Sequence, residues 1–284
     1  MTIQTFGIIG GDLRQLYCAR SIADDGFGVL IAGFDTCDNR MGLTAAEPSD
    51  IIRQSDAILL PLPVSTDGIH ILAPFSAVPI GAEAVLSQIR QNQAVFGGLP
   101  GKLSTDMLSA ISCGFYGKQE EFAAANAVPT AEGAIEAAMH HSDITLCQSD
   151  CLVIGFGRIG RVLSDFLRGL GAHVTVSARQ EKDLAFIRAS GMAAQKTDSL
   201  HGSFQFIFNT VPCRILDRKK LSEIGSEALI IDLASLPGGV DDEAAQRMAV
   251  PVIHALSLPG KVAPKTAGHI IKNAVYHLIR EASA

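Results

Sequence analysis

The segment CLVIGFGRIG at residues 151–160 joins a short apolar run to three spaced glycines. The run Cys151–Ile154 predicts a buried strand, and the ten residues after the segment have helical periodicity. In this spacing Gly155 allows a tight turn, Gly157 lets the backbone approach a pyrophosphate, and Gly160 allows close packing of helix on strand. The N–H groups that begin such a helix suit a phosphate. The segment therefore predicts a strand–turn–helix unit that binds a dinucleotide.

Short apolar runs alternate with helical stretches along the rest of the chain, which is typical of the α/β class. In the first half we expect strands at Phe6–Ile9, Gly28–Ala32, Ala57–Leu60 and Ala94–Phe96, and helices at Leu13–Asp24 and Glu83–Arg90. In the second half we expect strands at Cys151–Ile154, His173–Val176, Phe204–Asn209, Ala228–Asp232 and Pro251–His254, and a helix at 160–170. The pattern predicts two Rossmann-like domains with parallel sheets.

Two helices are expected to connect these domains. The Ala-rich stretch 129–142 begins with Pro129 and has an acidic first turn, which favours a helix N-terminus and a linker helix. The helix at 266–284 is long enough to return to the N-terminal domain. We therefore expect an N-terminal substrate and partner domain at 1–128, completed by 266–284, and a nucleotide-binding domain at 129–265 that includes the linker helix.

The opening segment GIIGGDLRQ at 7–15 also has a strand–glycine–helix form, but it lacks the third spaced glycine. We expect this degenerate turn to shape a substrate cleft rather than to hold a second dinucleotide. Asp12 is a favoured N-cap residue, so capping is the alternative explanation for its presence.

Composition excludes several classes of function. The chain of 284 residues has a net charge of −6, which predicts no nucleic-acid partner and no anionic membrane surface. The most apolar window, 57–82, contains four prolines and is no membrane span. The N-terminus has no secretory signal pattern, so we expect a cytoplasmic protein. The six cysteines form no CxxC pair, which predicts reduced thiols and no metal site.

The strand after the glycine-rich helix ends without the acidic residue that NAD-binding proteins place on the ribose. Ser177 and Arg179 stand there instead, and a hydroxyl with a cation suits a 2′-phosphate, so we expect NADP(H) in preference to NAD(H). The loops that follow later strand ends are expected to line the nicotinamide side. The predicted cofactor-binding residues are Gly155, Phe156, Gly157, Arg158, Ile159, Gly160, Ser177, Ala178, Arg179, Thr210, Val211, Pro212, Leu233, Ala234 and Ser235.

Several motifs together resemble the family of dipicolinate synthase A chains over nearly the whole sequence. They are GIIGGDLRQ (7–15), AGFD (32–35), the ILPLP-like stretch 58–63, PTAEG (129–133), VIGFGRIG (153–160), VSAR (176–179), DLASLPGG (232–239) and LPGKVAPKTAG (258–268). The stretch 74–118 matches least. The resemblance implies NADP-dependent oxidation of dihydrodipicolinate to dipicolinate during sporulation. It also implies a hetero-oligomer with a flavoprotein-like B chain in the mother-cell cytoplasm.

A dianionic substrate of this kind requires cations, and the matched motifs supply Arg14 and Lys265, with Lys261 and Arg214 behind them. Five further polar side chains are predicted at the substrate or its proton: Ser65, Thr66, Thr130, Glu132 and Thr266. Lys265 and Glu132 are the candidate catalytic residues. The alternatives are that Glu132 stabilises the first turn of the linker helix and that Lys265 and Thr266 only begin the final helix.

Two other functions remain as alternatives. A generic 2-hydroxyacid dehydrogenase shares the expected layout, but such enzymes carry an Arg after the fourth Rossmann strand and a His in the late loop. Here those places read Leu233-Ala-Ser and Leu256-Ser-Leu-Pro-Gly. The second alternative is a non-catalytic NADP-binding protein whose flavoprotein-like partner performs the chemistry.

Overall fold

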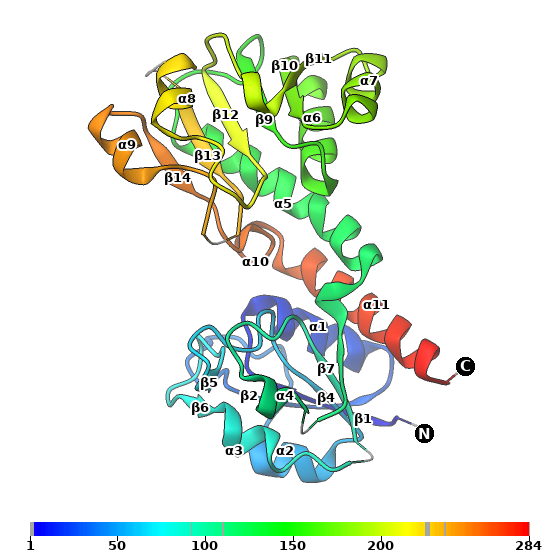
Figure 1. The fold of residues 1–284 in the computed structure, drawn as a ribbon. Helices are drawn as coiled ribbons and strands as arrows, with labels where there is room; N and C mark the ends of the chain where they lie inside the picture. Colours follow the sequence, from blue (N-terminus) through cyan, green and yellow to red (C-terminus); the bar gives the residue numbers. More distant parts are fainter. Residues whose placement is uncertain (1–2, 92, 110, 225–227, 236, 284) are drawn as a thin grey trace. The chain divides into compact units, whose positions relative to one another are not determined.

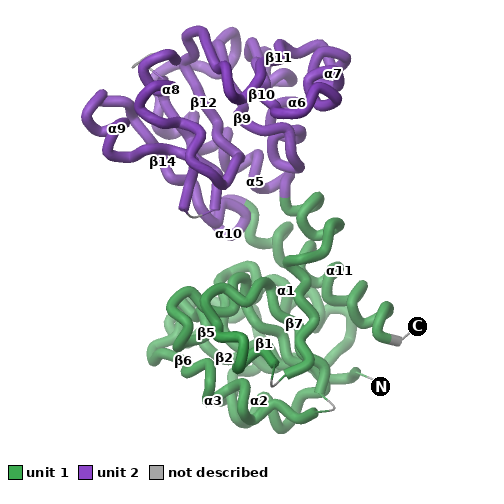
Figure 2. The backbone as a smooth tube through the Cα atoms, viewed as in Figure 1, with its two compact units in different colours: residues 1–126, 263–284 green, residues 127–262 purple. Residues whose placement is uncertain are grey.

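The computed structural model describes residues 3–91, 93–109, 111–224, 228–235 and 237–283. Leu236 of the DLASLPGG motif and the terminal residues of the expected domain ranges lie outside the described residues. The chain divides into two compact units, shown in Figure 2. Unit 1 comprises residues 1–126 and 263–284, and unit 2 comprises residues 127–262.

Unit 1 contains a six-stranded parallel sheet with the order β3-β2-β1-β4-β7-β8. Its strands are β1 (Thr5–Ile9), β2 (Gly28–Ala32), β3 (Thr44–Ala45), β4 (Ala57–Leu59), β7 (Ala94–Gly97) and β8 (Cys113–Phe115). The strand order reverses its direction between β1 and β4, where Ile8 pairs with Leu59. A separate antiparallel pair joins β5 (His70–Ile71) to β6 (Ile80–Gly81).

Unit 2 repeats this arrangement with the order β11-β10-β9-β12-β13-β14, again parallel throughout. Its strands are β9 (Asp150–Ile154), β10 (His173–Ala178), β11 (Ala193–Lys196), β12 (Phe206–Asn209), β13 (Leu229–Asp232) and β14 (Val252–His254). The two sheets confirm the prediction of an α/β chain with two Rossmann-like domains (Figure 1).

The helices connect the strands and cover the sheets. They are α1 (Leu13–Asp24), α2 (Pro48–Gln54), α3 (Ala82–Leu86), α4 (Thr105–Ser109), α5 (Glu120–His140), α6 (Arg158–Gly169), α7 (Glu181–Ala189), α8 (Arg218–Glu223), α9 (Asp242–Arg247), α10 (Leu258–Val262) and α11 (Pro264–Ser283). Short 3-10 turns occupy Tyr116–Lys118 and Thr197–Ser199. Within the described residues, no helix is both long and apolar enough to cross a membrane.

The linker helix differs from its predicted bounds. It begins at Glu120, so the prediction of a start at Pro129 is wrong, and the proline lies inside α5. An interior proline costs about 3 kcal/mol because it removes a backbone N–H donor. Burial on both sides of the proline offsets that cost: Phe122 joins the core of unit 1, and Ala131 and Ala134 join the core of unit 2.

Successive residues of each central strand enter separate apolar clusters. Ile8 packs in one cluster of unit 1 and Ile9 in another, while Phe206 and Ile207 do the same in unit 2. Strands of parallel sheets are buried on both faces in this way, so they read as continuous apolar runs. The carboxyl ends of the strands are therefore the place where polar groups emerge from each core.

The C-terminal helix returns to unit 1, as the sequence predicts. Figure 1 shows α11 lying beside α1, and Ile271 and Val275 are buried in the same cluster as Leu16 of α1. A Cβ added at Gly268 would lie 2.7 Å from the Arg14 carbonyl oxygen and 2.7 Å from the Cys18 nitrogen. The two helix backbones approach this closely because position 268 has no side chain.

Substitution of Gly268 by Ala tests this contact. The added methyl group forces the two helices apart, so we expect the free energy of unfolding of unit 1 to fall by about 1–3 kcal/mol. The chain has no Trp, and its three Tyr (17, 116 and 276) all lie in unit 1, so tyrosine fluorescence during urea unfolding reports on that unit. Gly81→Ala is the control within the same unit, because a Cβ there meets only the Ala84 Cβ, at an ordinary contact distance of 3.7 Å. A Gly268→Ala transition equal to that of the wild type would contradict the contact.

Candidate active site

The glycine-rich turn of unit 2 follows β9 and has the geometry that its spacing predicts. Gly155 has φ +99°, and a Cβ there would lie 2.5 Å from Thr210 Oγ1. A Cβ at Gly160 would overlap the carbonyl oxygen of Gly155. Both positions therefore exclude any larger residue, one by backbone conformation and one by contact between helix and turn.

Gly157 differs from the other two glycines, because a Cβ there would meet nothing within 4 Å. It is the N-cap residue of α6, and no side chain caps that helix start. The first N–H groups of a helix attract anions because they have no partner within the helix. The open space and the uncapped helix start fit a dinucleotide pyrophosphate.

A pocket of about 310 Å³ adjoins this turn. Most of the predicted cofactor residues lie on it; its lining is Gly155, Phe156, Gly157, Ala178, Arg179, Gln180, Asp183, Thr197, Thr210, Val211, Pro212 and Ile215. Arg158 and Ile159 do not line this pocket: the Arg158 side chain is exposed on α6, and Ile159 packs against the core.

Two residues near the end of β10, Ser177 and Arg179, are predicted to contact a 2′-phosphate, and the structure places them differently. Ser177 is fully buried, Thr197 Oγ1 donates a hydrogen bond of 3.4 Å to its hydroxyl, and Ser177 does not line the pocket. Its contact with a 2′-phosphate stays a prediction. Both faces of the sheet are covered, and from β10 only the last residue, Ala178, and the residues beyond it reach the pocket. Arg179 is such a residue: it is exposed and lines the pocket.

Arg161 is a residue beside this pocket that the sequence reasoning missed. Its guanidinium lies over the Phe156 ring at 4.7 Å, donates to the Phe156 carbonyl at 3.1 Å and lies 3.6 Å from Asp183. Asp183 lines the pocket, so Arg161 offsets a negative charge that would oppose a bound phosphate. The sequence signal for this role is its spacing: Arg161 stands three residues, about one helical turn, after Arg158 of the glycine-rich motif.

Two buried polar residues hold the loops that follow β12 and β13. Asn209 Nδ2 donates to Asp232 Oδ1 at 2.8 Å, and the Gly239 N–H donates to Asp232 Oδ2 at 2.9 Å. Leu233 and Ala234 are buried in the second loop, whereas Ser235 is exposed. Asn209 and Asp232 therefore position these loops, which the sequence placed at the nicotinamide side. Polar residues at the ends of otherwise apolar strands were the signal for this role.

The corresponding turn of unit 1 is filled by the chain itself. The Gly11 N–H donates to the Leu72 carbonyl at 2.7 Å, and a Cβ at Gly10 would lie 2.7 Å from Ile71 Cγ2. Asp12 caps α1 by accepting the Arg14 N–H at 2.9 Å. The groups that would bind a pyrophosphate already have partners, so this turn does not fit a second dinucleotide.

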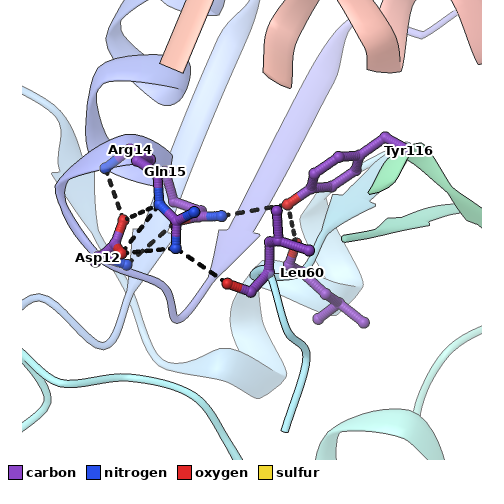
Figure 3. Close-up of polar contacts among 6 residues, drawn as sticks. Asp12, Arg14, Gln15, Leu60 and Tyr116 are labelled. Atoms are coloured by element: carbon purple, nitrogen blue, oxygen red, sulfur yellow. Dashed lines mark hydrogen bonds and ion pairs between the residues drawn. The ribbon is translucent and has the colours of Figure 1, made fainter. Parts of the chain in front are cut away.

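Arg14 lies in a polar cluster at the same strand ends (Figure 3). Its Nε and Nη2 donate to the Asp12 carboxylate at 2.9 and 2.8 Å, and Nη2 also donates to the Leu62 carbonyl at 3.0 Å. Beside it, Gln15 Nε2 donates to the Tyr116 hydroxyl, which burial holds at a raised pKa. Arg14 thus already has a carboxylate partner within the chain.

The other predicted substrate residues are divided between the units. Ser65 is buried in unit 1, where its hydroxyl donates to Asp67 Oδ1 at 3.1 Å and accepts the Gly68 N–H at 2.9 Å. Thr66 is exposed nearby. Lys265 and Thr266 are exposed at the start of α11, also in unit 1.

Thr130 and Glu132 belong to the part of α5 in unit 2, the first buried and the second exposed. Because α5 begins at Glu120, Glu132 lies beyond the first turn, and its alternative role in stabilising the helix start is wrong. Among the described residues, no group of three or more His, Cys, Asp or Glu side chains is arranged to hold a metal ion.

A comparison of Gly157→Ala with Gly160→Ala tests the nucleotide site. The Cβ at position 157 enters open space where the pyrophosphate would lie, so we expect at least a tenfold loss of NADPH affinity with an unchanged melting temperature. The Cβ at position 160 overlaps backbone, so we expect a lower melting temperature. NADPH fluorescence titration and circular dichroism measure the two effects. Full nucleotide affinity in Gly157→Ala would exclude the pyrophosphate from this turn.

Each half of the chain matches a model of a known protein family. Residues 5–113 match the family model of the N-terminal domain of the dipicolinate synthase A chain, and residues 123–248 match that of the D-isomer specific 2-hydroxyacid dehydrogenase NAD binding domain. The chain therefore carries a dehydrogenase-type domain that binds a nicotinamide dinucleotide.

Relatives of known name match both units together. The dipicolinate synthase A chain of Bacillus subtilis is 34% identical, with 98% of this chain and 96% of that protein covered. The crystal structure of the Bacillus subtilis A chain matches with a TM-score of 0.85 at 31% identity, covering 99% of this chain and 97% of that one. The structure of the Bacillus halodurans A chain matches with a TM-score of 0.85 at 30% identity and 97% coverage of both chains. The protein belongs to the family of dipicolinate synthase A chains.

Proposed function

We propose that this protein is the A chain of a two-component dipicolinate synthase and that it oxidises a CH–CH bond of dihydrodipicolinate with NADP⁺, giving the aromatic dipicolinate. The observation that carries the proposal is the 34% identity over 98% of the chain to a protein of that name, in combination with the open Gly157 turn. A bound oxidised nicotinamide supplies the hydride acceptor.

The chain's own residues bind and orient. The start of α6 and Gly157 receive the pyrophosphate, and Phe156 and the Thr210–Pro212 loop line the pocket beside it. Asn209 and Asp232 hold the two loops on the nicotinamide side in place. Such fixed loops favour hydride transfer because they hold the reacting groups in one geometry.

Two features support NADP(H) over NAD(H). Arg179 is exposed at the pocket, immediately after β10, and the neighbouring Ala178 and Gln180 carry no charge that would repel a 2′-phosphate. Asp183, the carboxylate that lines the pocket, is offset by Arg161. Arg179 therefore serves as the charge-assisted donor to the 2′-phosphate.

The substrate dianion is assigned to the polar residues that the family motifs carry. Lys265, exposed at the start of α11, binds one carboxylate, and Thr266 beside it donates a hydrogen bond. Arg14 is the second cation of the proposal: its guanidinium pairs with Asp12, and it binds a substrate carboxylate in exchange for that partner. Within unit 1, Thr66 is a further proposed hydrogen-bond donor, and buried Ser65 supports the loop that carries it. Within unit 2, Thr130 and Glu132 are the proposed polar residues.

The proposed setting is a hetero-oligomer with the flavoprotein-like B chain in the mother-cell cytoplasm of a sporulating bacterium. The names of the relatives support a second component, since each relative is designated by the letter A. Unit 2 carries exposed apolar side chains, including Phe186 and Val128, around a hollow of about 620 Å³ that a partner would cover.

The direct test is an assay of the purified protein, alone and with its B partner, on dihydrodipicolinate and NADP⁺. We expect NADPH absorbance to rise in step with dipicolinate formation, because each aromatised ring releases one hydride. Dipicolinate formation that needs the partner's own cofactor and not NADP⁺ would overturn the proposal and favour a non-catalytic nucleotide-binding role.

Arg179→Ala tests the nucleotide preference. Loss of a charge-assisted hydrogen bond of about 1.5–3 kcal/mol predicts roughly a tenfold or greater rise in the Kd for NADPH, with little change for NADH. Fluorescence titration with both nucleotides measures the effect. Arg188→Ala is the matched control, since Arg188 is exposed on α7 and does not line the pocket. An equal loss for NADPH and NADH would contradict the role of Arg179.

A further inference from the structure

Unit 1 has a pocket of its own at the carboxyl ends of its strands. The pocket has a volume of about 580 Å³, which lies in the range of small-molecule sites. The residues that line it come from three segments: 32–35 at the end of β2, 46–49 after β3, and 76–88, which contains β6 and α3. All three segments belong to unit 1, so the pocket is complete within that unit.

The nucleotide pocket of unit 2 is formed by the corresponding loops. Its lining includes residues 178–180 at the end of β10, Thr197 after β11, and residues between 210 and 215 after β12. In the sheet of unit 1, β2, β3 and β4 hold the places that β10, β11 and β12 hold in unit 2. In dinucleotide-binding folds the residues that follow the second strand contact the ribose of the nucleoside. Unit 1 thus has a counterpart of the nucleoside pocket, while the place of the pyrophosphate is closed at the Gly11 N–H.

Asp35, which follows β2, supplies a carboxylate to this pocket. Its loop is fixed, because Phe34 is buried in the core and the Arg40 guanidinium donates to the carbonyls of Phe34 and Asp35 at 3.2 and 3.0 Å. The Oδ2 atom of Asp35 accepts long hydrogen bonds of 3.4 Å from the Ser76 hydroxyl and the Ala77 N–H. Its Oδ1 atom has no hydrogen-bond donor among the described residues. One carboxylate oxygen is therefore available to a ligand.

The charged residues that line the pocket are both acidic. They are Asp35 and Glu47, and no Lys or Arg of the described chain lines it. The Glu47 side chain makes no hydrogen bond or ion pair within that part of the chain. Because two carboxylates repel an anion, the pocket disfavours phosphate and dicarboxylate ligands and favours a ligand with hydroxyl donors. It is therefore a different site from those proposed for NADP(H) and for the substrate dianion.

Apolar side chains form much of the remaining wall. Pro48, Pro79 and Ile80 line the pocket together with Val85 of α3. The β5–β6 pairing, in which Ile80 lies opposite Ile71, fixes this wall. Apolar walls with a few placed polar groups are usual in small-molecule sites, and they suit a planar base. The volume exceeds the 310 Å³ of the unit 2 pocket, so there is room for a purine.

We propose that this pocket of unit 1 binds a purine nucleoside that has no 5′-phosphate. The 2′- and 3′-hydroxyls of its ribose donate to the Asp35 carboxylate. The base packs against Pro48, Pro79 and Ile80. The inference goes beyond the proposed function, because neither NADP(H) nor dihydrodipicolinate is assigned to this pocket.

The first test is isothermal titration calorimetry of adenosine and guanosine with the full chain, with NADPH at saturation. NADPH fills the proposed nucleotide site of unit 2, so the remaining heat reports on the pocket of unit 1. We expect the affinity to fall about tenfold or more when the 2′-hydroxyl of the bound nucleoside is removed, because Asp35 loses a donor. We expect a similar loss when a 5′-phosphate is added, because it brings a like charge to Asp35 and Glu47.

Asp35→Asn tests the carboxylate itself. Asp38→Asn is the matched control, since Asp38 is exposed in the same loop and does not line the pocket. Loss of charge-assisted hydrogen bonds predicts about a tenfold or greater rise in the nucleoside Kd for Asp35→Asn, and no change for the control. The melting temperature and the NADPH affinity stay at wild-type values, because the Asp35 side chain makes only long hydrogen bonds within the described chain. Equal nucleoside affinity in Asp35→Asn and the wild type would overturn the inference.

Photolabelling with 8-azidoadenosine locates the nucleoside directly. We expect cross-linked peptides from 46–49 and 76–88 in the wild type. Ala84→Phe suppresses this label, because position 84 is exposed on α3 and a ring there fills the pocket. Label confined to unit 2, or binding of neither nucleoside in the presence of NADPH, would contradict the site. These readouts do not involve NADP⁺ reduction, so they separate this inference from the proposed function.

Discussion

Each unit has a turn after the first strand of its sheet, β1 in unit 1 and β9 in unit 2. Whether that turn is open or filled by the chain determines whether the unit can bind a dinucleotide. In unit 1 the Leu72 carbonyl accepts the Gly11 N–H, and the Asp12 side chain caps the helix that follows. In unit 2 the space beside Gly157 is open and α6 has no side-chain cap. Two sheets with the same strand order therefore have one turn that fits a pyrophosphate and one that is closed by the chain's own loop.

Much of the fold was predictable because each sheet is covered on both faces. Central strands such as β9 and β12 read as continuous apolar runs, and the spacing of Gly155, Gly157 and Gly160 gives their separate roles directly. The start of α5 was not predictable from local signals. Pro129 reads as a helix start, but burial of Phe122 before it extends the helix back to Glu120. Tertiary packing overrides local preference there.

The candidate site was less predictable than the fold. The spacing of residues in a motif predicts the backbone geometry, but it does not predict which partners each side chain contacts. Arg179 is exposed as expected, whereas Ser177, two residues earlier, is buried by the element that carries Thr197. Arg14 has the charge that a dianion requires, but its ion pair with Asp12 could not be predicted from the sequence, because the pair forms only when Asp12 caps the start of α1. The Leu72 carbonyl, which accepts the Gly11 N–H and closes the turn of unit 1, comes from a segment 61 residues later in the chain, and no local motif encodes that contact.

The discontinuity of unit 1 sets the order in which the chain acquires structure during synthesis. Its sheet is encoded before residue 127, but Ile271 and Val275, which complete the core around α1, are synthesised only after all of unit 2. Unit 2 is a continuous segment whose residues are all available earlier. Unit 2, the nucleotide-binding half, is thus synthesised in full before α11, and until α11 follows, unit 1 remains without its covering helix.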